Sequence, residues 1–556
     1  MRVAVAAVMM SVLAAACASD DSSSVASSPS TTPAAESPSA TPEPSGTPSG
    51  EADETPTPTD QETLPWGPTE EEYAEAESIV ADMSLSEKAG QVIMAGYQGL
   101  EPPTDLIAEL NLGGVIVMGD NVGSLEQLRQ AAAEVQDADS RAYPVMVGVD
   151  QEGGTVARVR EPATEFPTYM TLGAARDSEL TTDVARASGD ELRALGFTMT
   201  FAPVADVTSG PDDPTIGSRA ASSDPGLVAE TVAASLDGYA DAGIIAVPKH
   251  FPGHGSVPAD SHEELPVQER TLGELRELDF VPFEAAVDAG APAVMVGHID
   301  VQDVDPGVPS SLSGDVIDLL RADLAFDGLV VTDAQDMAAI TETYGAGEAA
   351  VRALEAGSDL VLMPADVAAA HTAIVDAVDE GRLTAERLDE AATRGVAVML
   401  HQQAAGDGPD EDSVGSHDEL SYRASLEAVT IATGACSGPY VGDSIQITGG
   451  DEQDRARLTE AAEEAGLSVG SGEAVRLLGG ASGGSGDVVV SLDTPYVLGE
   501  SDASTKVALY GRTPAAFRAL VDVLLGEVTA HGRLPTDVDG VDQLGCPSPP
   551  QSTSSP

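Results

Sequence analysis

The densest group of reactive side chains lies in one short segment that contains Lys249, His250 and His254, followed by Asp260 and His262. Glycine and proline residues keep this segment out of regular structure, so it can present several side chains to one cavity. Metal binding is one interpretation, but the spacing fits no short zinc signature. We favour acid–base chemistry, because His262 can exchange a proton near neutral pH and Asp260 can orient its ring.

A second candidate group is Asp333, which directly follows the apolar run Val330–Thr332. A carboxylate at the end of a buried strand can attack an electrophilic carbon or stabilise a developing positive charge. An exposed strand-end cap is the alternative.

Short β-branched runs alternate with amphipathic helical stretches, the pattern of successive βα units around a parallel sheet. Eight strands are predicted, at Val92–Ala95, Val115–Met118, Val145–Val149, Thr198–Phe201, Ile244–Val247, Ala293–Val296, Leu329–Thr332 and Leu360–Met363. Helices are predicted between them at Ser124–Ala138, Asp183–Ala194, Leu227–Ala240, Leu272–Ala289, Gly314–Leu324 and Gly347–Ala356. Eight units over roughly 300 residues fit a TIM (β/α)8 barrel, and a doubly wound open sheet shares much of this pattern.

The polar residues that follow the predicted strands favour the barrel. They are Asp150, Gln151, Glu152, Asp206, Lys249, His250, His298, Asp300 and Asp333. A barrel active site is built by the loops at the carboxyl ends of the strands, so these side chains would meet at one rim. Four of the eight histidines of the chain also lie between residues 250 and 298. The sequence therefore predicts an α/β barrel whose chemistry converges on one end.

The charge balance excludes one class of partner. The chain has 26 Lys and Arg against 93 Asp and Glu, a formal net charge of −67. Nucleic acid is held through a basic surface that neutralises phosphates, so a nucleic-acid partner is excluded. Hydrophobic residues make up 42% of the chain, which is enough for sizeable cores.

The N-terminal residues 1–16 are predicted to be an export signal, because an early cation precedes an apolar run that is too short to span a bilayer. Cys17 follows three alanines, which resembles the lipobox of bacterial lipoproteins and implies lipidation of this cysteine. An ordinary signal peptide is the alternative. Residues 17–66 are mostly Ser, Thr and Pro, so we expect a disordered spacer. The mature protein would be extracytoplasmic and lipid-anchored to the cell membrane, or secreted if the lipobox is not used.

Cys436 and Cys546 are the two remaining cysteines. In an oxidising compartment they can pair and tie the start of a C-terminal domain to its end. Two isolated buried thiols are the alternative, and the sequence leaves this choice open.

Four motifs resemble glycoside hydrolase family 3, and more narrowly its β-N-acetylglucosaminidase branch. They are Met83–Gln91, Asp150–Gly154, Lys249–Gly255 with the downstream Asp260–His262, and Thr332–Ala334. The resemblance covers about residues 79–400. Beyond Ser421 it is weaker, where Tyr510–Pro514 and Gly532–Pro535 look like the close of the family's αβα-sandwich domain. We therefore expect a catalytic TIM barrel at 67–402, a linker at 403–420, a smaller sandwich-like α/β domain at 421–546 and a disordered tail at 547–556.

The resemblance implies roles for particular residues. Asp333 would be the nucleophile, His262 the general acid/base, and Asp260 its partner in an Asp–His dyad. The positions that would bind the sugar are Asp150, Arg158, Arg219, Lys249 and His250. The implied reaction is retaining hydrolysis of a terminal β-linked N-acetylglucosamine, with no metal or organic cofactor. Peptidoglycan fragments (muropeptides) are the expected carbohydrate substrate, an expectation that rests on the predicted location and the family.

Two other functions compete with this one. A family 3 β-glucosidase or β-xylosidase is the first, although such members usually lack the Asp-Ser-His segment found at Asp260–His262. A non-catalytic sugar-binding lipoprotein is the second, but it would not need both Asp333 and the dyad. The sequence leaves open the leaving-group sugar, the choice between water and phosphate as acceptor, the role of the C-terminal domain and the oligomeric state.

Overall fold

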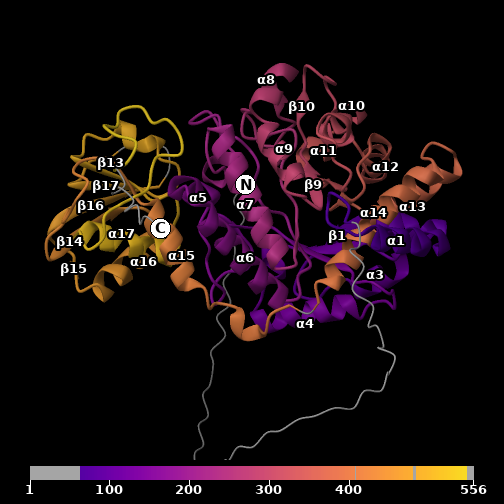
Figure 1. The fold of residues 1–556 in the computed structure, drawn as a ribbon, viewed down its shortest axis with the longest axis horizontal. Coiled ribbons are helices and arrows are strands. Elements are labelled where there is room, and N and C mark those ends of the chain that lie inside the picture. Colours follow the sequence, from indigo (N-terminus) through magenta and orange to yellow (C-terminus); the bar gives the residue numbers. More distant parts are fainter. Residues whose placement is uncertain (1–62, 407, 480–483, 547–556) are drawn as a thin grey trace, which may run out of the picture. The chain divides into compact units, whose positions relative to one another are not determined.

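The computed structural model describes residues 63–406, 408–479 and 484–546 (Figure 1). The predicted export signal, Cys17 and the C-terminal tail lie outside these residues, as does most of the predicted spacer. The predicted C-terminal limit of the spacer, residue 66, is wrong. Trp66 is 4% exposed and packs edge-to-face on Tyr73, and Thr63 forms a β-bridge with Thr69. Burial of the indole ring draws these residues into the folded part.

The eight predicted strands are all present, each within one residue of its expected ends. They are β1 (Ile93–Gly96), β2 (Gly114–Val117), β3 (Met146–Val149), β6 (Met199–Thr200), β7 (Ile245–Ala246), β9 (Ala293–Val296), β11 (Leu329–Thr332) and β12 (Val361–Leu362). Six pair in parallel in the order β12-β1-β2-β3-β6-β7, and β9 pairs in parallel with β11. Parallel bridges from Phe251 to Val296 and from Val331 to Leu360 close the ring. The fold is therefore a TIM-like barrel.

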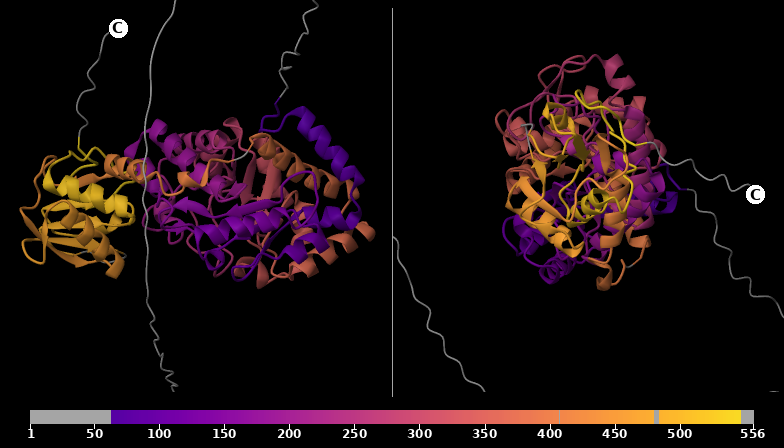
Figure 2. Two further views of the ribbon diagram at one scale, coloured as in Figure 1. Left: turned by 90° about the horizontal axis from the view of Figure 1, so that it is seen from below. Right: turned by 90° about the vertical axis from the view of Figure 1, so that its left-hand side faces the viewer.

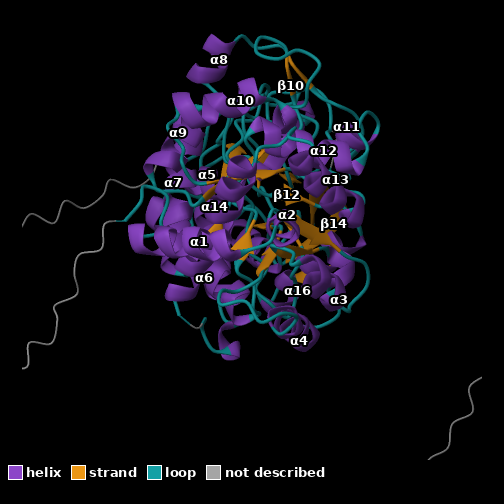
Figure 3. Cartoon of the chain, turned by 90° about the vertical axis from the view of Figure 1, so that its right-hand side faces the viewer, coloured by secondary structure: helices purple, strands orange, loops and turns teal. Residues whose placement is uncertain are grey.

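Helices cover the outside of this barrel (Figure 3). Four of the predicted ones appear as α4 (Leu125–Gln136), α6 (Ser178–Ala194), α7 (Pro225–Asp241) and α12 (Ala346–Ala356). The others in this part of the chain are α1 (Glu70–Asp82), α2 (Leu85–Gln91), α3 (Thr104–Leu110), α5 (Tyr169–Ala175), α11 (Ala338–Thr341), α13 (Val367–Asp379) and α14 (Ala385–Ala404). Local signals start several of them. The Ser124 hydroxyl, for example, accepts a hydrogen bond from the amide of Gln127 at the first turn of α4.

Two of the predicted helices are broken. The stretch Leu272–Ala289 forms α8 (Leu272–Glu277) and α9 (Val281–Asp288). Between them the fully buried carboxylate of Asp279 accepts hydrogen bonds from Arg270 at 2.6 Å and Ser256 at 2.9 Å. These partners turn Asp279 inward, and Pro282, which has no amide hydrogen to donate, starts the new helix α9. The second stretch begins as α10 (Gly314–Asp318) and continues as a π-helical turn over Leu319–Asp323.

The C-terminal part forms a second sheet, seen in the orange-to-yellow segment of Figure 2. Its strands are β13 (Thr430–Thr433), β14 (Ser444–Gly449), β15 (Ser468–Val469), β16 (Glu473–Leu478), β17 (Val488–Ser491) and β18 (Thr505–Ala508). Their order is β13-β18-β17-β16-β14-β15, and the edge strand β13 is antiparallel to β18. A disulfide joins Cys436 to Cys546, with a Cα–Cα distance of 5.5 Å.

The two faces of this sheet are covered differently. Side chains alternate between faces along each strand, so Val490 points to one face and Val489 to the other. The Val490 face packs on α15 (Asp418–Ala428), α16 (Glu452–Glu464) and α17 (Pro514–Leu525). The Val489 face packs on Met170 of the barrel helix α5. The C-terminal domain is thus an α/β layer whose second face is covered partly by the barrel, rather than by a helical layer entirely of its own.

No helix among the described residues is long and apolar enough to cross a membrane.

Candidate active site

The predicted site residues of the barrel follow the carboxyl ends of its strands. Asp150 follows β3, Lys249 and His250 follow β7, and Asp333 directly follows β11. These strands run parallel in one closed barrel, so their carboxyl ends lie at the same rim. The structure therefore brings together side chains that are far apart in the chain.

Asp333, the predicted nucleophile, is 5% exposed. Its amide donates to the carbonyl of Val296 on β9 at 2.9 Å, and its Oδ1 accepts from the amide of Ala334 at 2.8 Å. Burial raises the pKa of Asp333, but the nearby His250 ring and the Ala334 amide outweigh it and bring the pKa below its ordinary value. The carboxylate is therefore ionised at neutral pH, as a nucleophile must be.

The predicted dyad is formed. Nδ1 of His262 lies 2.7 Å from Oδ1 of Asp260, and the amide of His262 donates to the same oxygen at 2.9 Å. Burial raises the pKa of Asp260, but these two hydrogen bonds lower it by more. The side chain of His262 is 62% exposed, so its Nε2 is accessible for proton transfer to a bound ligand.

The dyad loop is attached to the same rim as Asp333. The hydroxyl of Ser261, which is 2% exposed, lies 3.2 Å from Nε2 of His254, and its carbonyl accepts from the amide of Ala339 in α11. Asp336, three residues after Asp333, interacts electrostatically with both Asp333 and His262. The loop that carries the dyad is therefore anchored to His254 and to α11, a helix that begins five residues after Asp333.

A buried ionic cluster lies beside Asp333. Nζ of Lys249 is 2.6 Å from Oδ1 of Asp150 and 2.8 Å from Oε1 of Glu152. Arg219 makes two hydrogen bonds of 2.8 Å to the oxygens of Glu152. Burial raises the pKa of Glu152, but Arg219 and Lys249 hold it well below its usual range. Burial lowers the pKa of Lys249, but Asp150 and Glu152 raise it above its usual value, so both charges persist.

Arg158 extends this cluster toward the open side. Its Nη2 lies 3.7 Å from Oδ2 of Asp150. Its Nε is buried and has no hydrogen-bond partner among the described residues. A buried guanidinium donor without a partner is costly unless a ligand supplies an acceptor. This arrangement suits a ligand that carries several hydroxyl or carbonyl oxygens.

His250 is oriented by a residue to which the sequence assigned no role. Nδ1 of His250 lies 2.7 Å from Oδ2 of the fully buried Asp206, whose Oδ1 accepts from the amides of His250 and His254. Nη2 of Arg219 lies 3.5 Å from Nε2 of the same ring. Glu152 is the second such residue, because it neutralises both Lys249 and Arg219. The sequence did contain a signal for Asp206 and Glu152, because each acid follows a predicted strand.

The remaining predicted residues lie elsewhere. Cys436 and Cys546 belong to the C-terminal sheet unit, and Cys17 is outside the described residues. Within the described part of the chain, no group of three or more His, Cys, Asp or Glu side chains is arranged to hold a metal ion.

The C-terminal domain borders the rim. A cleft of about 1130 Å³ is lined by Thr155 and Arg219 from the barrel and by Asp493, Tyr496 and Arg512 from the C-terminal domain. Arg219 also belongs to the ionic cluster, so the cleft adjoins the predicted sugar site. The C-terminal domain therefore contributes to the surroundings of that site and does not only pack against the barrel.

Comparison with known proteins identifies the family. The model of the glycosyl hydrolase family 3 N-terminal domain matches residues 84–398, which is more than half of the chain. Beta-hexosaminidase LpqI of Mycobacterium tuberculosis is 35% identical over 341 residues, which are 60% of this chain and 87% of that protein. Beta-hexosaminidase A of Pseudoalteromonas piscicida is 32% identical over 364 residues, and the match spans 61% of that protein.

A solved structure agrees with these matches. The family 3 beta-N-acetylglucosaminidase from Paenibacillus sp. str. FPU-7 superposes with a TM-score of 0.74 at 30% identity, covering 82% of this chain and 99% of that one. The similarity therefore extends over the barrel and the C-terminal domain. On this evidence the chain belongs to glycosyl hydrolase family 3 and is a glycoside hydrolase.

Proposed function

We propose that this protein is a retaining exo-β-N-acetylglucosaminidase that releases terminal β-linked N-acetylglucosamine. The observation that carries the proposal is the 2.7 Å contact between Asp260 and His262 on the rim that also holds Asp333. Family 3 β-glucosidases and β-xylosidases usually lack this Asp-Ser-His segment, which disfavours them. The beta-hexosaminidase relatives support the same substrate class.

The reaction would proceed in two displacements. Asp333 attacks the anomeric carbon, the bond to the leaving oxygen breaks, and that oxygen takes the proton from Nε2 of His262. His262 then removes a proton from water, which attacks the same carbon and releases the sugar and Asp333. Asp260 holds the ring through Nδ1 and balances its positive charge whenever Nε2 also carries a proton. Sugar hydroxyl and N-acetyl groups bind to Asp150, Arg158, Arg219, Lys249 and His250.

An imidazole has an advantage over a carboxylate in this position. Two carboxylates close together cannot both ionise easily, because each raises the pKa of the other. The pKa of Asp333 is below its ordinary value, with burial opposing and the nearby His250 ring favouring ionisation. A histidine as the acid/base adds no second anion beside it. Asp333 can therefore stay ionised beside the group that donates the proton.

The test compares nitrophenyl glycosides of β-N-acetylglucosamine, β-glucose and β-xylose. We expect turnover of the first to exceed that of the other two, with the anomeric proton of the initial product in the β configuration by NMR. Faster release from glucose or xylose would replace the substrate assignment. An α product would overturn the double displacement, and no turnover of any glycoside would favour a sugar-binding protein.

The natural substrate and the location are proposed together. We propose lipid attachment at Cys17, which would keep residues 67–402 and 421–546 outside the cytoplasm and near peptidoglycan fragments. The substitution Cys17→Ala should abolish incorporation of labelled fatty acid into the protein without loss of activity. Incubation with purified muropeptides should release free N-acetylglucosamine. Equal labelling of the Cys17→Ala protein would contradict the anchor, and intact muropeptides would contradict the substrate.

A further inference from the structure

His298 is a buried histidine that the proposed reaction does not use. It follows β9, the strand that pairs with β11, and its side chain is fully buried. Its Nδ1 lies 2.7 Å from the hydroxyl of Ser311, and its Nε2 lies 3.0 Å from the carbonyl oxygen of Ala334. Both ring nitrogens therefore have a partner, and one partner is the residue next to Asp333.

These two partners define which nitrogen carries the proton. A carbonyl oxygen can only accept, so Nε2 of His298 must donate to Ala334. Burial lowers the pKa of His298, so the ring is neutral and its Nδ1 accepts from the hydroxyl of Ser311. The hydrogen bond to Ser311 thus selects the tautomer that can hold Ala334.

Ala334 connects this ring to the carboxylate of Asp333. Its amide donates to Oδ1 of Asp333 at 2.8 Å, while its carbonyl is held by His298. The amide of Asp333 donates to Val296, two residues before His298 on the same chain segment. Residues at the end of β9 therefore hold Asp333 through its amide and through the residue that follows it. With Oδ1 engaged, Oδ2 has no protein hydrogen-bond partner among the described residues.

We infer that His298 is a positioning residue for the nucleophile, a role that rests on the proposed assignment of Asp333. By holding the carbonyl of Ala334, it fixes the amide that binds Oδ1 and so presents Oδ2 to the anomeric carbon. Near-attack geometry requires the reacting atoms about 3–3.5 Å apart, and a misplacement of about 1 Å costs on the order of 100-fold in rate. The path from His298 to the carboxylate runs through Ala334, whose carbonyl it holds and whose amide binds Oδ1.

The test uses two substitutions, each of which keeps one of the two hydrogen bonds of His298, to Ala334 or to Ser311. Glutamine can place an amide donor near the position of Nε2, so His298→Gln preserves the hydrogen bond to Ala334. Asparagine is shorter and preserves only the contact with Ser311. We expect His298→Asn to lower kcat on the order of 100-fold with KM nearly unchanged, and His298→Gln to stay within about tenfold of the unsubstituted enzyme. The substrate is whichever nitrophenyl glycoside that enzyme turns over.

Thermal unfolding of both variants separates positioning from folding. Equal unfolding temperatures with unequal kcat support the inference. Normal kcat in His298→Asn, or equal losses in the two variants, would overturn it. If His298→Asn does not fold, Ser311→Ala replaces it, and we expect loss of the hydroxyl that selects the tautomer to lower kcat. The double variant His298→Gln with Ser311→Ala should have the same kcat as His298→Gln alone. A lower kcat in the double variant would also overturn the inference.

A failure of the proposed function gives a different result. If Asp333 is not the nucleophile, Asp333→Asn retains turnover in the otherwise unsubstituted enzyme. If the sugar is wrongly assigned, the enzyme prefers another glycoside, and the comparison of the His298 variants is made with that glycoside.

Discussion

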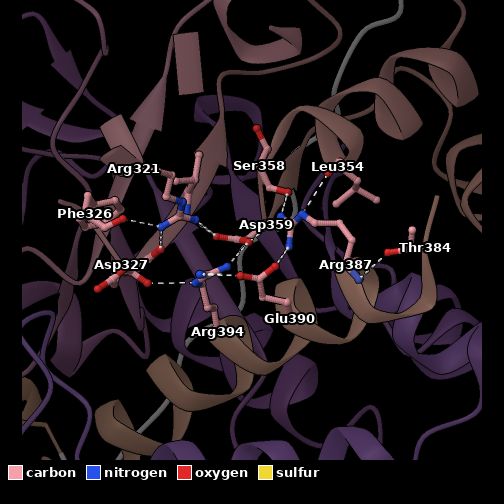
Figure 4. A network of polar contacts seen from close by, with 12 residues as sticks. Arg321, Phe326, Asp327, Leu354, Ser358, Asp359, Thr384, Arg387, Glu390 and Arg394 are labelled. Carbon is pink, nitrogen blue, oxygen red and sulfur yellow. Dashed lines mark hydrogen bonds and ion pairs between the residues drawn. The ribbon is translucent and has the colours of Figure 1, made fainter. Parts of the chain in front are cut away.

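The two ends of the barrel each bury a carboxylate among cations, but they use it differently. At the amino ends of the strands, Asp359 is 1% exposed and contacts Arg321 at 2.6 Å, Arg387 at 2.7 Å and Arg394 at 3.2 Å (Figure 4). At the carboxyl ends, Glu152 is 6% exposed and contacts Lys249 and Arg219, both at 2.8 Å. Similar charges thus occur at opposite ends of one fold.

The difference lies in how the remaining donors are used. At the Asp359 end, the guanidinium groups also donate to backbone carbonyls: Arg321 to Phe326 and Gly328, Arg387 to Leu354 and Ser358, and Arg394 to Asp327. At the Glu152 end, the neighbouring Arg158 keeps a buried Nε without a protein partner. A network closed by the protein stabilises the fold, whereas one with a free donor can bind a ligand.

The largest expected effect belongs to Asp333 at the open end. The substitution Asp333→Asn removes the attacking anion, and we expect kcat to fall by on the order of 10⁴-fold or more. Steady-state kinetics with the nitrophenyl glycoside measure it, and circular dichroism provides the control for folding. A loss below about tenfold would mean that another group is the nucleophile.

His262→Ala should be the next most severe change. Removal of the acid/base should cost about 10²- to 10⁴-fold on substrates with a sugar leaving group, because the departing alkoxide needs a proton. Nitrophenolate leaves without one, so the loss of the first step should be much smaller on nitrophenyl glycosides. Pre-steady-state release of nitrophenolate tests this difference. Equal losses in that step on both substrate types would contradict the assignment.

Asp359→Asn should affect stability and spare chemistry. Breaking a buried ion pair costs about 3–5 kcal/mol in the free energy of unfolding, which denaturant titration measures. Burial raises the pKa of Asp359, but Arg321, Arg394 and Arg387 bring it below 3.8. Its contribution to stability is therefore complete above pH 3.8, its ordinary value, and is lost as the pH falls through the lower folded pKa.

The variant should accordingly lose less stability than the unsubstituted protein over that acidic range. Its kcat at a temperature where it is folded should be unchanged. A large fall in kcat without a loss of stability would erase the contrast between the two ends of the barrel.

Arg158→Met should give the smallest effect. It removes the free donor, so we expect KM to rise about tenfold, equivalent to about 1.4 kcal/mol, with little change in stability. The matched control is Arg321→Met at the closed end, which should lower stability and leave KM unchanged. If Arg158→Met and Arg321→Met change KM and stability in the same way, the free Nε donor of Arg158 does not distinguish the two ends of the barrel.

Local sequence patterns accounted for much of the framework. The β-branched runs predicted the eight barrel strands, since buried parallel strands are apolar on both faces. The dyad was also predictable, because Asp260 and His262 are two residues apart and need only a tight loop to meet. The break near Asp279 had a sequence signal in Pro282, which cannot continue a helix and stands in the first turn of α9. The inward turn of the Asp279 carboxylate to Arg270 and Ser256 was not predictable.

The candidate site was predicted in part for the same reason. Position after a strand identified Asp333, Lys249 and His250. It gave no role to Glu152, whose partner Arg219 is 67 residues away, or to Asp206, which contacts His250 across 44 residues. Such partners are chosen by the order of strands around the barrel.

Residue order alone thus determined which segments become strands, which side chains stand at their carboxyl ends, and which acid lies beside His262. Only the closed barrel decided that Glu152 neutralises two cations, that Asp206 orients His250, and that His298 holds the residue after Asp333. The physical reason is range: strand propensity and loop contacts act over a few residues, whereas burial and ion pairing depend on neighbours that only the folded chain brings together.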